Sequence, residues 1–257
     1  MAGGNAHAGR TVTAKALALL GAFDPGRREL TLSELARSAD VPVPTAHRLV
    51  GELASWGALA RRPSGRYAVG RRLWDLGLLA PEPAGLRGTA APFLHDLYAA
   101  TLATVHLAVR DGTEALYLDR VSGRGSVPVV SRVGGRLPLH ATGVGKVLLA
   151  HAPEDVRREV LGRLTRITPH TVVQPGRLDR QLRRVRQDDL ATTLEEMTLG
   201  ACSLAVPVRA GGGRPGPEGA PVVAALGVVV ADLRRDRARL LAALRVAAAG
   251  ISRHLSA

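Results

Sequence analysis

The chain has 257 residues, of which 46% are hydrophobic but only 3% aromatic, so its cores must be built mainly from small aliphatic side chains. Lys and Arg number 35 against 22 Asp and Glu, and the formal charge of +13 favours an anionic partner, nucleic acid first. An arginine-rich surface can also reflect the base composition of the coding DNA. The single cysteine excludes an internal disulfide and a cysteine-based zinc site.

No segment has the character of a membrane span or a secretion signal. Residues 1–10 are rich in Gly and Ala and lack the apolar stretch of a signal peptide. The longest apolar run, Pro221 to Ala231, is about half the length of a transmembrane helix. We therefore expect a soluble cytoplasmic protein.

The N-terminal quarter of the chain predicts three helices. Apolar residues recur at helical spacing from Thr11 to Phe23. A second, short helix follows Thr31, whose hydroxyl forms a capping box with Glu34 three residues later. A third helix runs from about Pro44 to Ser55 and stops at Gly57.

A hairpin follows these helices. Two strand-like segments, Ala58 to Arg62 and Arg66 to Gly70, flank a Pro-Ser-Gly turn. Three helices and a hairpin make a winged helix, here over residues 9–70. The second and third helices, separated by Val41-Pro42, have the spacing of a helix-turn-helix, whose second helix enters the DNA major groove. The alternative is a plain three-helix bundle with a solvated arginine face.

The predicted recognition helix presents a short set of candidate base-reading side chains. Thr45 and Arg48 are neighbours near its start; arginine can bond a guanine edge, and the threonine methyl can meet a thymine. His47 is either a DNA contact or a packing residue at the helix edge. The wing adds arginines suited to phosphates or the minor groove: Arg61, Arg62 and Arg66.

Beyond residue 70 we expect a linker helix over residues 71–88 and an α+β sheet domain over residues 89–257. The helical pattern is expected to be interrupted near Pro81 and Pro83 and again at Pro92. The predicted strands are Thr104 to Arg110, Ala115 to Val121, Cys202 to Arg209 and Val222 to Val230. The predicted helices are Thr142 to Ala150, Glu154 to Arg163, Leu178 to Asp188 and Leu233 to Leu255. The Gly- and Pro-rich stretch from Gly211 to Gly219 predicts a flexible tip.

Several sequence motifs follow one another in order along nearly the whole chain. The N-terminal motifs are Leu30-Thr31-Leu32-Ser33-Glu34-Leu35-Ala36, Thr45-Ala46-His47-Arg48-Leu49 and Gly65-Arg66-Tyr67-Ala68-Val69-Gly70. The most specific C-terminal motif is Arg136-Leu137-Pro138-Leu139-His140-Ala141-Thr142-Gly143-Val144-Gly145-Lys146, and Cys202-Ser203-Leu204-Ala205-Val206-Pro207-Val208 is another. Together these motifs resemble the IclR family of bacterial transcription regulators. The resemblance implies a GAF-like antiparallel effector domain, dimers often paired into tetramers, palindromic DNA sites, and small organic acids or aromatics as effectors.

The chain departs from the family pattern at two places. Val43-Pro44 stand where family members often carry Lys-Ser before the recognition threonine, so an operator preference cannot be carried over. In members that bind small carboxylates, an Asp and two Ser line the pocket. The matching positions here are Thr192, Gly227 and Val229.

We predict an effector pocket between the start of the helix at Gly143, the segment from Thr192 to Met197, and the strands that hold Cys202 and Gly227. Backbone N–H groups at the Gly-rich helix start suit a carboxylate or phenolic oxygen. Apolar walls would leave the oxygens of a glyoxylate-sized ligand unpaired, so a larger effector with one polar end is expected. The full predicted lining is Leu139, Gly143, Val144, Gly145, Thr192, Met197, Cys202, Gly227 and Val229. The alternative is that these residues are ordinary core.

The residues do not have the spacing that a nucleotide-binding, metal-binding or catalytic motif requires. We therefore expect no cofactor, no metal and no catalytic residue. A nucleotide-binding loop around Gly145-Lys146 would need Gly and Ser or Thr where the chain has His140 and Val147. Cys202 is flanked by apolar residues typical of a core strand, so it is either a pocket-lining residue or an inert buried thiol.

The function that these patterns favour is a transcription regulator whose affinity for double-stranded DNA responds to a small molecule. An enzyme would need a catalytic constellation, and none is found in the sequence. A structural nucleoid protein would not need the second domain. Thermal stabilisation by a metabolite would separate a regulator from a nucleoid protein, and turnover of a substrate would indicate an enzyme.

Overall fold

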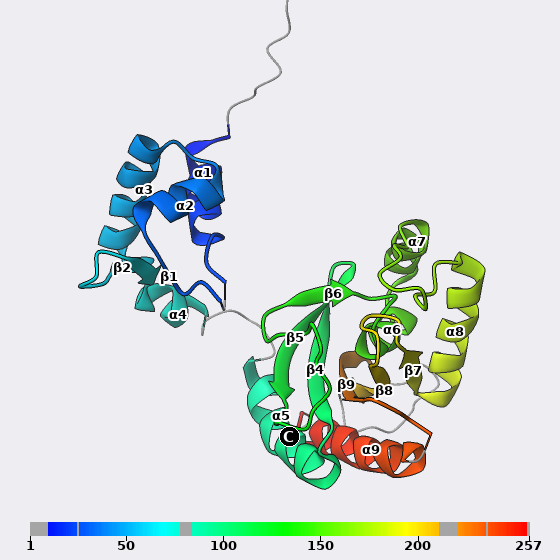
Figure 1. Cartoon of the computed structure of the whole chain (residues 1–257). Helices are drawn as coiled ribbons and strands as arrows, with labels where there is room; N and C mark the ends of the chain where they lie inside the picture. Colours follow the sequence, from blue (N-terminus) through cyan, green and yellow to red (C-terminus); the bar gives the residue numbers. More distant parts are fainter. Residues whose placement is uncertain (1–9, 25, 78–83, 211–219, 235, 256–257) are drawn as a thin grey trace, which may run out of the picture. The chain divides into compact units, whose positions relative to one another are not determined.

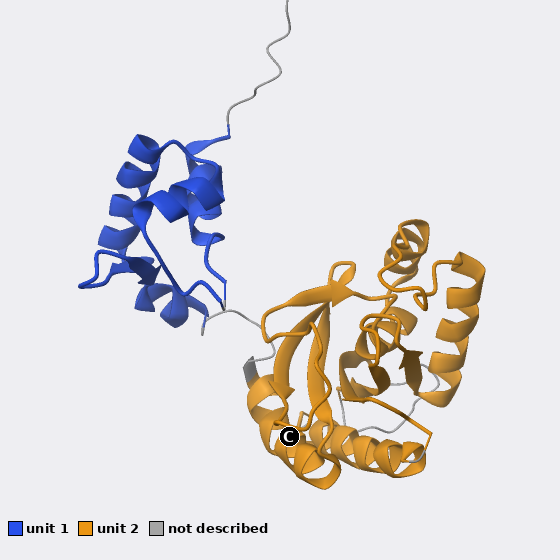
Figure 2. Ribbon diagram, in the orientation of Figure 1, with its two compact units in different colours: residues 1–82 blue, residues 83–257 orange. Residues whose placement is uncertain are grey.

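The computed structural model describes residues 10–24, 26–77, 84–210, 220–234 and 236–255. The chain forms two compact units, Met1–Glu82 and Pro83–Ala257, which are coloured separately in Figure 2. The first unit has one hydrophobic cluster and the second has two, so each unit is described by itself. In the described residues no helix is long and apolar enough to cross a membrane.

The first unit is a winged helix-turn-helix, as predicted (Figure 1). Its elements are α1 (Val12–Leu20), β1 (Glu29–Leu30), α2 (Leu32–Ala39), α3 (Val43–Trp56), β2 (Leu59–Arg61), β3 (Tyr67–Val69) and α4 (Arg71–Gly77). The strands pair antiparallel in the order β1-β3-β2. The sequence analysis predicted the β2–β3 hairpin but missed β1, because two residues are too few to show a strand period.

The start of α2 is fixed by the capping box predicted from sequence. The Thr31 hydroxyl accepts a hydrogen bond from the Glu34 amide at 3.2 Å, and a Glu34 carboxylate oxygen accepts one from the Thr31 amide at 2.7 Å. Leu35 and Ala36 then point into the unit's core together with Leu49 and Val50 of α3. This packing sets the position of α3, the recognition helix.

The second unit is built on a six-stranded antiparallel sheet of order β6-β5-β4-β9-β8-β7. Its strands are β4 (Thr104–Asp111), β5 (Glu114–Val121), β6 (Arg136–Pro138), β7 (Ala191–Leu194), β8 (Cys202–Arg209) and β9 (Val222–Val230). The sheet and its helices confirm the predicted α+β class. The sequence analysis missed β6 and β7, which are short and lie at the sheet edges.

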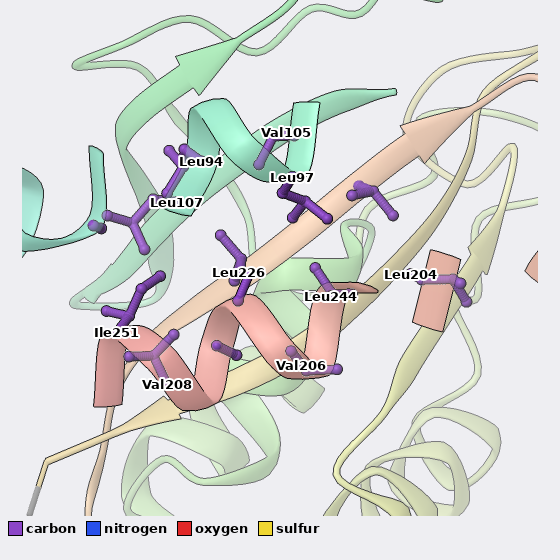
Figure 3. Packing of buried hydrophobic residues seen from close by; sticks show 14 of the residues in the cluster. Leu94, Leu97, Val105, Leu107, Leu204, Val206, Val208, Leu226, Leu244 and Ile251 are labelled. Atoms are coloured by element: carbon purple, nitrogen blue, oxygen red, sulfur yellow. The ribbon is translucent and has the colours of Figure 1, made fainter. Parts of the chain in front are cut away.

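Helices cover both faces of this sheet. The helices α5 (Ala84–Thr101) and α9 (Arg237–His254) pack on one face, where Leu94 and Leu244 meet Leu107 and Leu226 of the central strands (Figure 3). The other face carries α6 (Gly143–Ala150), with α7 (Glu154–Gly162) and α8 (Pro175–Asp188) packed beyond it (Figure 1). The strands β4, β5, β8 and β9 therefore send alternate side chains into two different cores.

The predicted interruption at Pro92 is wrong, because α5 continues through this residue to Thr101. A proline inside a helix costs about 3 kcal/mol. Burial of Ala90 and Leu94 on either side of it, against the sheet and α9, offsets this cost. The helix also runs through residue 88, where the linker was predicted to end. Pro81, Pro83 and the predicted tip from Gly211 to Gly219 lie outside the described residues.

Candidate DNA-reading surface and effector cavity

The recognition helix α3 presents the side chains that the sequence analysis selected. Ala46, Leu49 and Val50 are buried, so the opposite side of α3 faces solvent. On that side His47 and Arg48 are exposed, and Thr45 is half-buried. After the exposed apolar residues Val43 and Pro44, the solvent-facing side of α3 is thus polar from Thr45 to Arg48. These residues lie in the N-terminal half of the helix, which is the part of a recognition helix that contacts bases.

Arg48 is held in an ion pair on the surface of α3. Its guanidinium lies 2.6 Å from a carboxylate oxygen of Glu52, and both side chains are more than half exposed. Exposed helical pairs of this type are worth about 0.3–0.5 kcal/mol, whereas a bidentate arginine–guanine contact is worth about 1–3 kcal/mol. A guanine edge can therefore compete with Glu52 for Arg48.

The three wing arginines have different surroundings. Among the described residues, the Arg61 side chain has no hydrogen-bond or ion-pair partner, and the Arg62 side chain makes only an exposed ion pair with Glu29 at 3.3 Å. Arg66 donates to the Glu29 carbonyl at 2.9 Å and lies 3.3 Å from the Glu34 carboxylate. Arg66 thus ties the wing to α2, while Arg61 is available to a phosphate.

The positive charge is not concentrated in the unit that reads DNA. Residues 1–82 contain 11 Lys and Arg against 7 Asp and Glu, a net charge of +4 out of +13 for the whole chain. The other +9 lies on residues 83–257. The recognition helix and wing therefore indicate DNA binding more specifically than the overall charge does.

The second unit contains a cavity between α6, the sheet and two loops. Its volume of about 50 Å³ is room for roughly four waters, since one buried water needs about 10–15 Å³. Strands β4, β5, β7, β8 and β9 and the loops around residues 130 and 198 supply its walls. Among the described residues that line it, none is Asp, Glu, Lys or Arg.

Five of the nine residues predicted for the effector pocket line this cavity. They are Gly143, Val144, Met197, Gly227 and Val229. The other four, Leu139, Gly145, Thr192 and Cys202, do not line it.

Strand alternation explains two of the misplaced predictions. Cys202 belongs to the core against α5 and α9, so the next residue, Ser203, faces the cavity. In the same way Thr193, the register partner of Ser203, lines the cavity in place of Thr192. The two hydroxyls lie 2.6 Å apart, so this wall, which was expected to be apolar, carries a hydrogen-bonding pair.

Two glycines allow α6 to approach the sheet. A Cβ atom at Gly143 would lie 2.4 Å from the Ser203 hydroxyl, and one at Gly227 would lie 2.8 Å from the nearest Val144 methyl. The first turn of α6 is therefore held against β8 and β9. Within this turn Gly145 donates its amide hydrogen to the Thr142 hydroxyl at 3.1 Å, which explains why Gly145 does not serve the cavity.

The sequence analysis missed a polar group on the opposite side of the cavity. His106 is 4% exposed, and its Nε2 lies 2.7 Å from the Ser131 hydroxyl. Burial, with a smaller effect from the Arg120 charge, lowers the pKa of His106 to about 3, so the ring is neutral at physiological pH. Burial also raises the pKa of neighbouring Tyr117 to about 12. The available signal was a lone histidine in the apolar segment from Thr104 to Val109.

Lys146 was considered only as part of a phosphate loop, but it has a different role. Its ammonium lies 2.6 Å from a Glu196 carboxylate oxygen and donates to the Gln181 side chain at 2.9 Å. The lysine side chain is 1% exposed and the glutamate side chain 7%. Burial lowers the pKa of Lys146, and the Glu196 charge opposes the shift. The pair fixes the loop that brings Met197 to the cavity.

A winged helix-turn-helix with an exposed recognition helix, followed by a sheet domain with a cavity, defines the class of DNA-binding transcription regulators with a separate second domain. Residues 12–63 match the family described as IclR helix-turn-helix domain. Residues 82–253 match the family described as Bacterial transcriptional regulator IclR C-terminal. The chain belongs to the IclR family of transcription regulators.

Characterised relatives and solved structures agree with this assignment. The chain is 31% identical over 246 residues to the Glycerol operon regulatory protein of Streptomyces coelicolor, covering 95% of each chain. It is 31% identical over 197 residues to the transcriptional regulator XynR of Escherichia coli, covering 76% of this chain and 78% of that protein. An IclR homologue from Microbacterium hydrocarbonoxydans, solved in complex with 4-hydroxybenzoate, has a TM-score of 0.86 at 35% identity, covering 95% of this chain and 99% of that chain.

Proposed function

We propose that this regulator binds a pseudo-palindromic operator as a two-fold dimer in the cytoplasm, without catalysing a reaction. In unit 1, α4 buries none of its residues, and Trp74 and Leu76 are 63% and 45% exposed. Large exposed apolar side chains on one short helix support a contact with a second copy. Two copies would place two recognition helices at neighbouring half-sites.

We assign base reading to Thr45, His47 and Arg48, and phosphate binding to Arg61 and Arg62. The exposure of α3 and the unpaired state of Arg61 support this division. Arg66, which was predicted to contact DNA, is better suited to holding the wing in shape, because Glu29 and Glu34 already bind it.

Replacing Arg48 with alanine is expected to weaken binding to the specific site by about 1–3 kcal/mol and to flatten base preference at one position per half-site. Arg61→Ala should instead weaken binding to all sequences alike and reduce the slope of log K against log salt by about one. Fluorescence anisotropy with operator variants over a salt series measures both effects. Unchanged base preference in Arg48→Ala would show that α3 does not read bases through this residue.

We propose that the cavity of the second unit binds an aromatic or branched monocarboxylic acid, and that 4-hydroxybenzoate is a suitable first candidate. The observation that carries this proposal is an uncharged cavity whose polar groups are hydroxyls, a neutral imidazole and the first amides of α6. The start of a helix favours an anion. The 4-hydroxybenzoate complex of the similar Microbacterium protein supports the same class.

Regulation then follows from linkage. The effector can shift operator affinity only by as much as its own affinity differs between the DNA-binding and non-binding arrangements of the dimer. Because half-sites must lie about one helical turn apart, a change in the spacing of the two recognition helices changes affinity.

Isothermal titration calorimetry of the full-length protein tests the proposed effector class. We expect 4-hydroxybenzoate or a branched acid to bind, and glyoxylate and pyruvate to bind far more weakly, since small acids leave the Val144 and Val229 walls uncovered. Tight binding of pyruvate or glyoxylate, with none of the larger acids, would contradict the proposal. Consumption of any of these ligands during the titration would point to an enzyme instead.

A further inference from the structure

Resting on the proposed effector class, we infer that the cavity selects a ligand with polar groups at both ends of an apolar body, and that His106 with Ser131 binds the end remote from α6. This differs from the single polar end expected from sequence. The inference rests on where two polar clusters lie on the sheet and on what separates them.

The first polar cluster is the pair formed by His106 and Ser131. A neutral imidazole has one donor and one acceptor nitrogen. Among the described residues the ring makes one hydrogen bond, from or to Nε2, so Nδ1 has no protein partner. Whichever tautomer is present, the pair can offer a donor or an acceptor to a hydroxyl or carbonyl oxygen.

The second polar cluster lies on the other side of β9. It consists of the Thr193 and Ser203 hydroxyls, 2.6 Å apart, beside the first turn of α6 at Gly143. The hydroxyls and the free amides of this turn suit a carboxylate. His106 pairs with Gly227 of β9, whereas Ser203 pairs with Val229, two residues further along this strand. The two clusters are therefore two strand spacings apart across the sheet, about 9.6 Å, and two residues apart along it, about 6.8 Å.

The surface between the two clusters is apolar. Gly227 of β9 is the register partner of His106, and it has no side chain to divide the cavity. Val144 covers this glycine, and Val229 and Met197 complete the apolar part of the lining. A ring-sized apolar body fits this surface, with its anionic group at Ser203 and an uncharged polar substituent at His106.

The order of polar, apolar and polar surfaces makes His106 a specificity-determining residue. A ligand that lacks the distal polar group leaves Nδ1 of the imidazole without a partner inside the cavity, because the Ser131 hydroxyl already bonds Nε2. A charged distal group would also be disfavoured, because none of the described lining residues carries an opposite charge.

The test compares benzoate with its para-hydroxyl and meta-hydroxyl derivatives by calorimetry on the full-length protein. We expect the wild type to bind the para derivative at least about tenfold more tightly than benzoate and more tightly than the meta derivative. His106→Leu should bring the ratio of the para and benzoate Kd values close to one, and His106→Gln should restore part of the preference. Ser203→Ala should weaken all three ligands by a similar factor, because all share the carboxylate.

Ser131→Ala serves as the second variant, since Ser131 lies in a loop and is not part of a strand. It should lower the same preference, so the inference can be tested even if His106→Leu fails to fold. Equal binding of benzoate and the para derivative by the wild type, or an undiminished preference in Ser131→Ala, would overturn the inference alone. Binding of none of the three would overturn the proposed effector class and the inference with it.

Discussion

Lys146→Met is expected to lower the free energy of unfolding of the second unit by about 3–5 kcal/mol. Methionine matches the length of the lysine stem but removes the ammonium, which lies 2.6 Å from Glu196. The Glu196 carboxylate would stay buried, and the hydrogen bond left to it would be a long one, 3.4 Å from the Val172 amide. Leaving one buried charge without a partner costs more free energy than losing the attraction between the two charges. Urea unfolding followed by circular dichroism measures the effect.

The matched control is the double variant Lys146→Met with Glu196→Gln. Glutamine keeps the shape of the side chain and its acceptor for Val172 but removes the charge, so the double variant should recover a large part of the lost stability. A single variant that loses less than about 1 kcal/mol would show that the pair is not buried in solution. A double variant no more stable than the single one would show that charge burial is not the cause.

Truncation to residues 1–70, which removes α4 and the second unit, is expected to reduce operator affinity by about 10²–10⁴-fold, because two linked DNA-binding units bind as one and separate units do not. The fragment should remain folded, since Leu19, Leu35 and Leu49 form a core within it. Anisotropy with a full operator and with a single half-site measures the loss. The full-length protein should lose most of its advantage on the half-site, where only one reader can bind.

Sedimentation of the full-length protein tests whether dimerisation is the reason for its higher operator affinity. A full-length chain that sediments as a monomer both free and on DNA would contradict the prediction. So would a fragment that binds the full operator as tightly as the whole protein. Introducing Arg48→Ala into the fragment is the control, since the fragment should still depend on this residue.

Local patterns in the sequence determined most of the elements. The capping box of Thr31 and Glu34 fixed the start of α2, and the apolar spacing of Ala46, Leu49 and Val50 fixed the buried face of α3. The strands β8 and β9 have the predicted bounds because both are long apolar segments bordered by residues typical of turns. Each of these signals acts over a few neighbouring residues, so each can be recognised without the tertiary structure.

The tertiary structure decided which face of a strand forms the site. A run of apolar residues in a strand buried on both sides does not show which alternate set faces which core, so Cys202 was predicted in place of Ser203. The pairing of β7 with β8 and the packing of α6 against Gly227 determine which alternate side chains of these strands face the cavity.

The polar pairs of the second unit were also beyond sequence reasoning. His106 lies 25 residues before Ser131, and Lys146 lies 50 residues before Glu196. No periodic pattern links residues so far apart. Only the folded chain brings them together, and burial then makes His106 neutral and makes it costly to remove either partner of the Lys146–Glu196 ion pair.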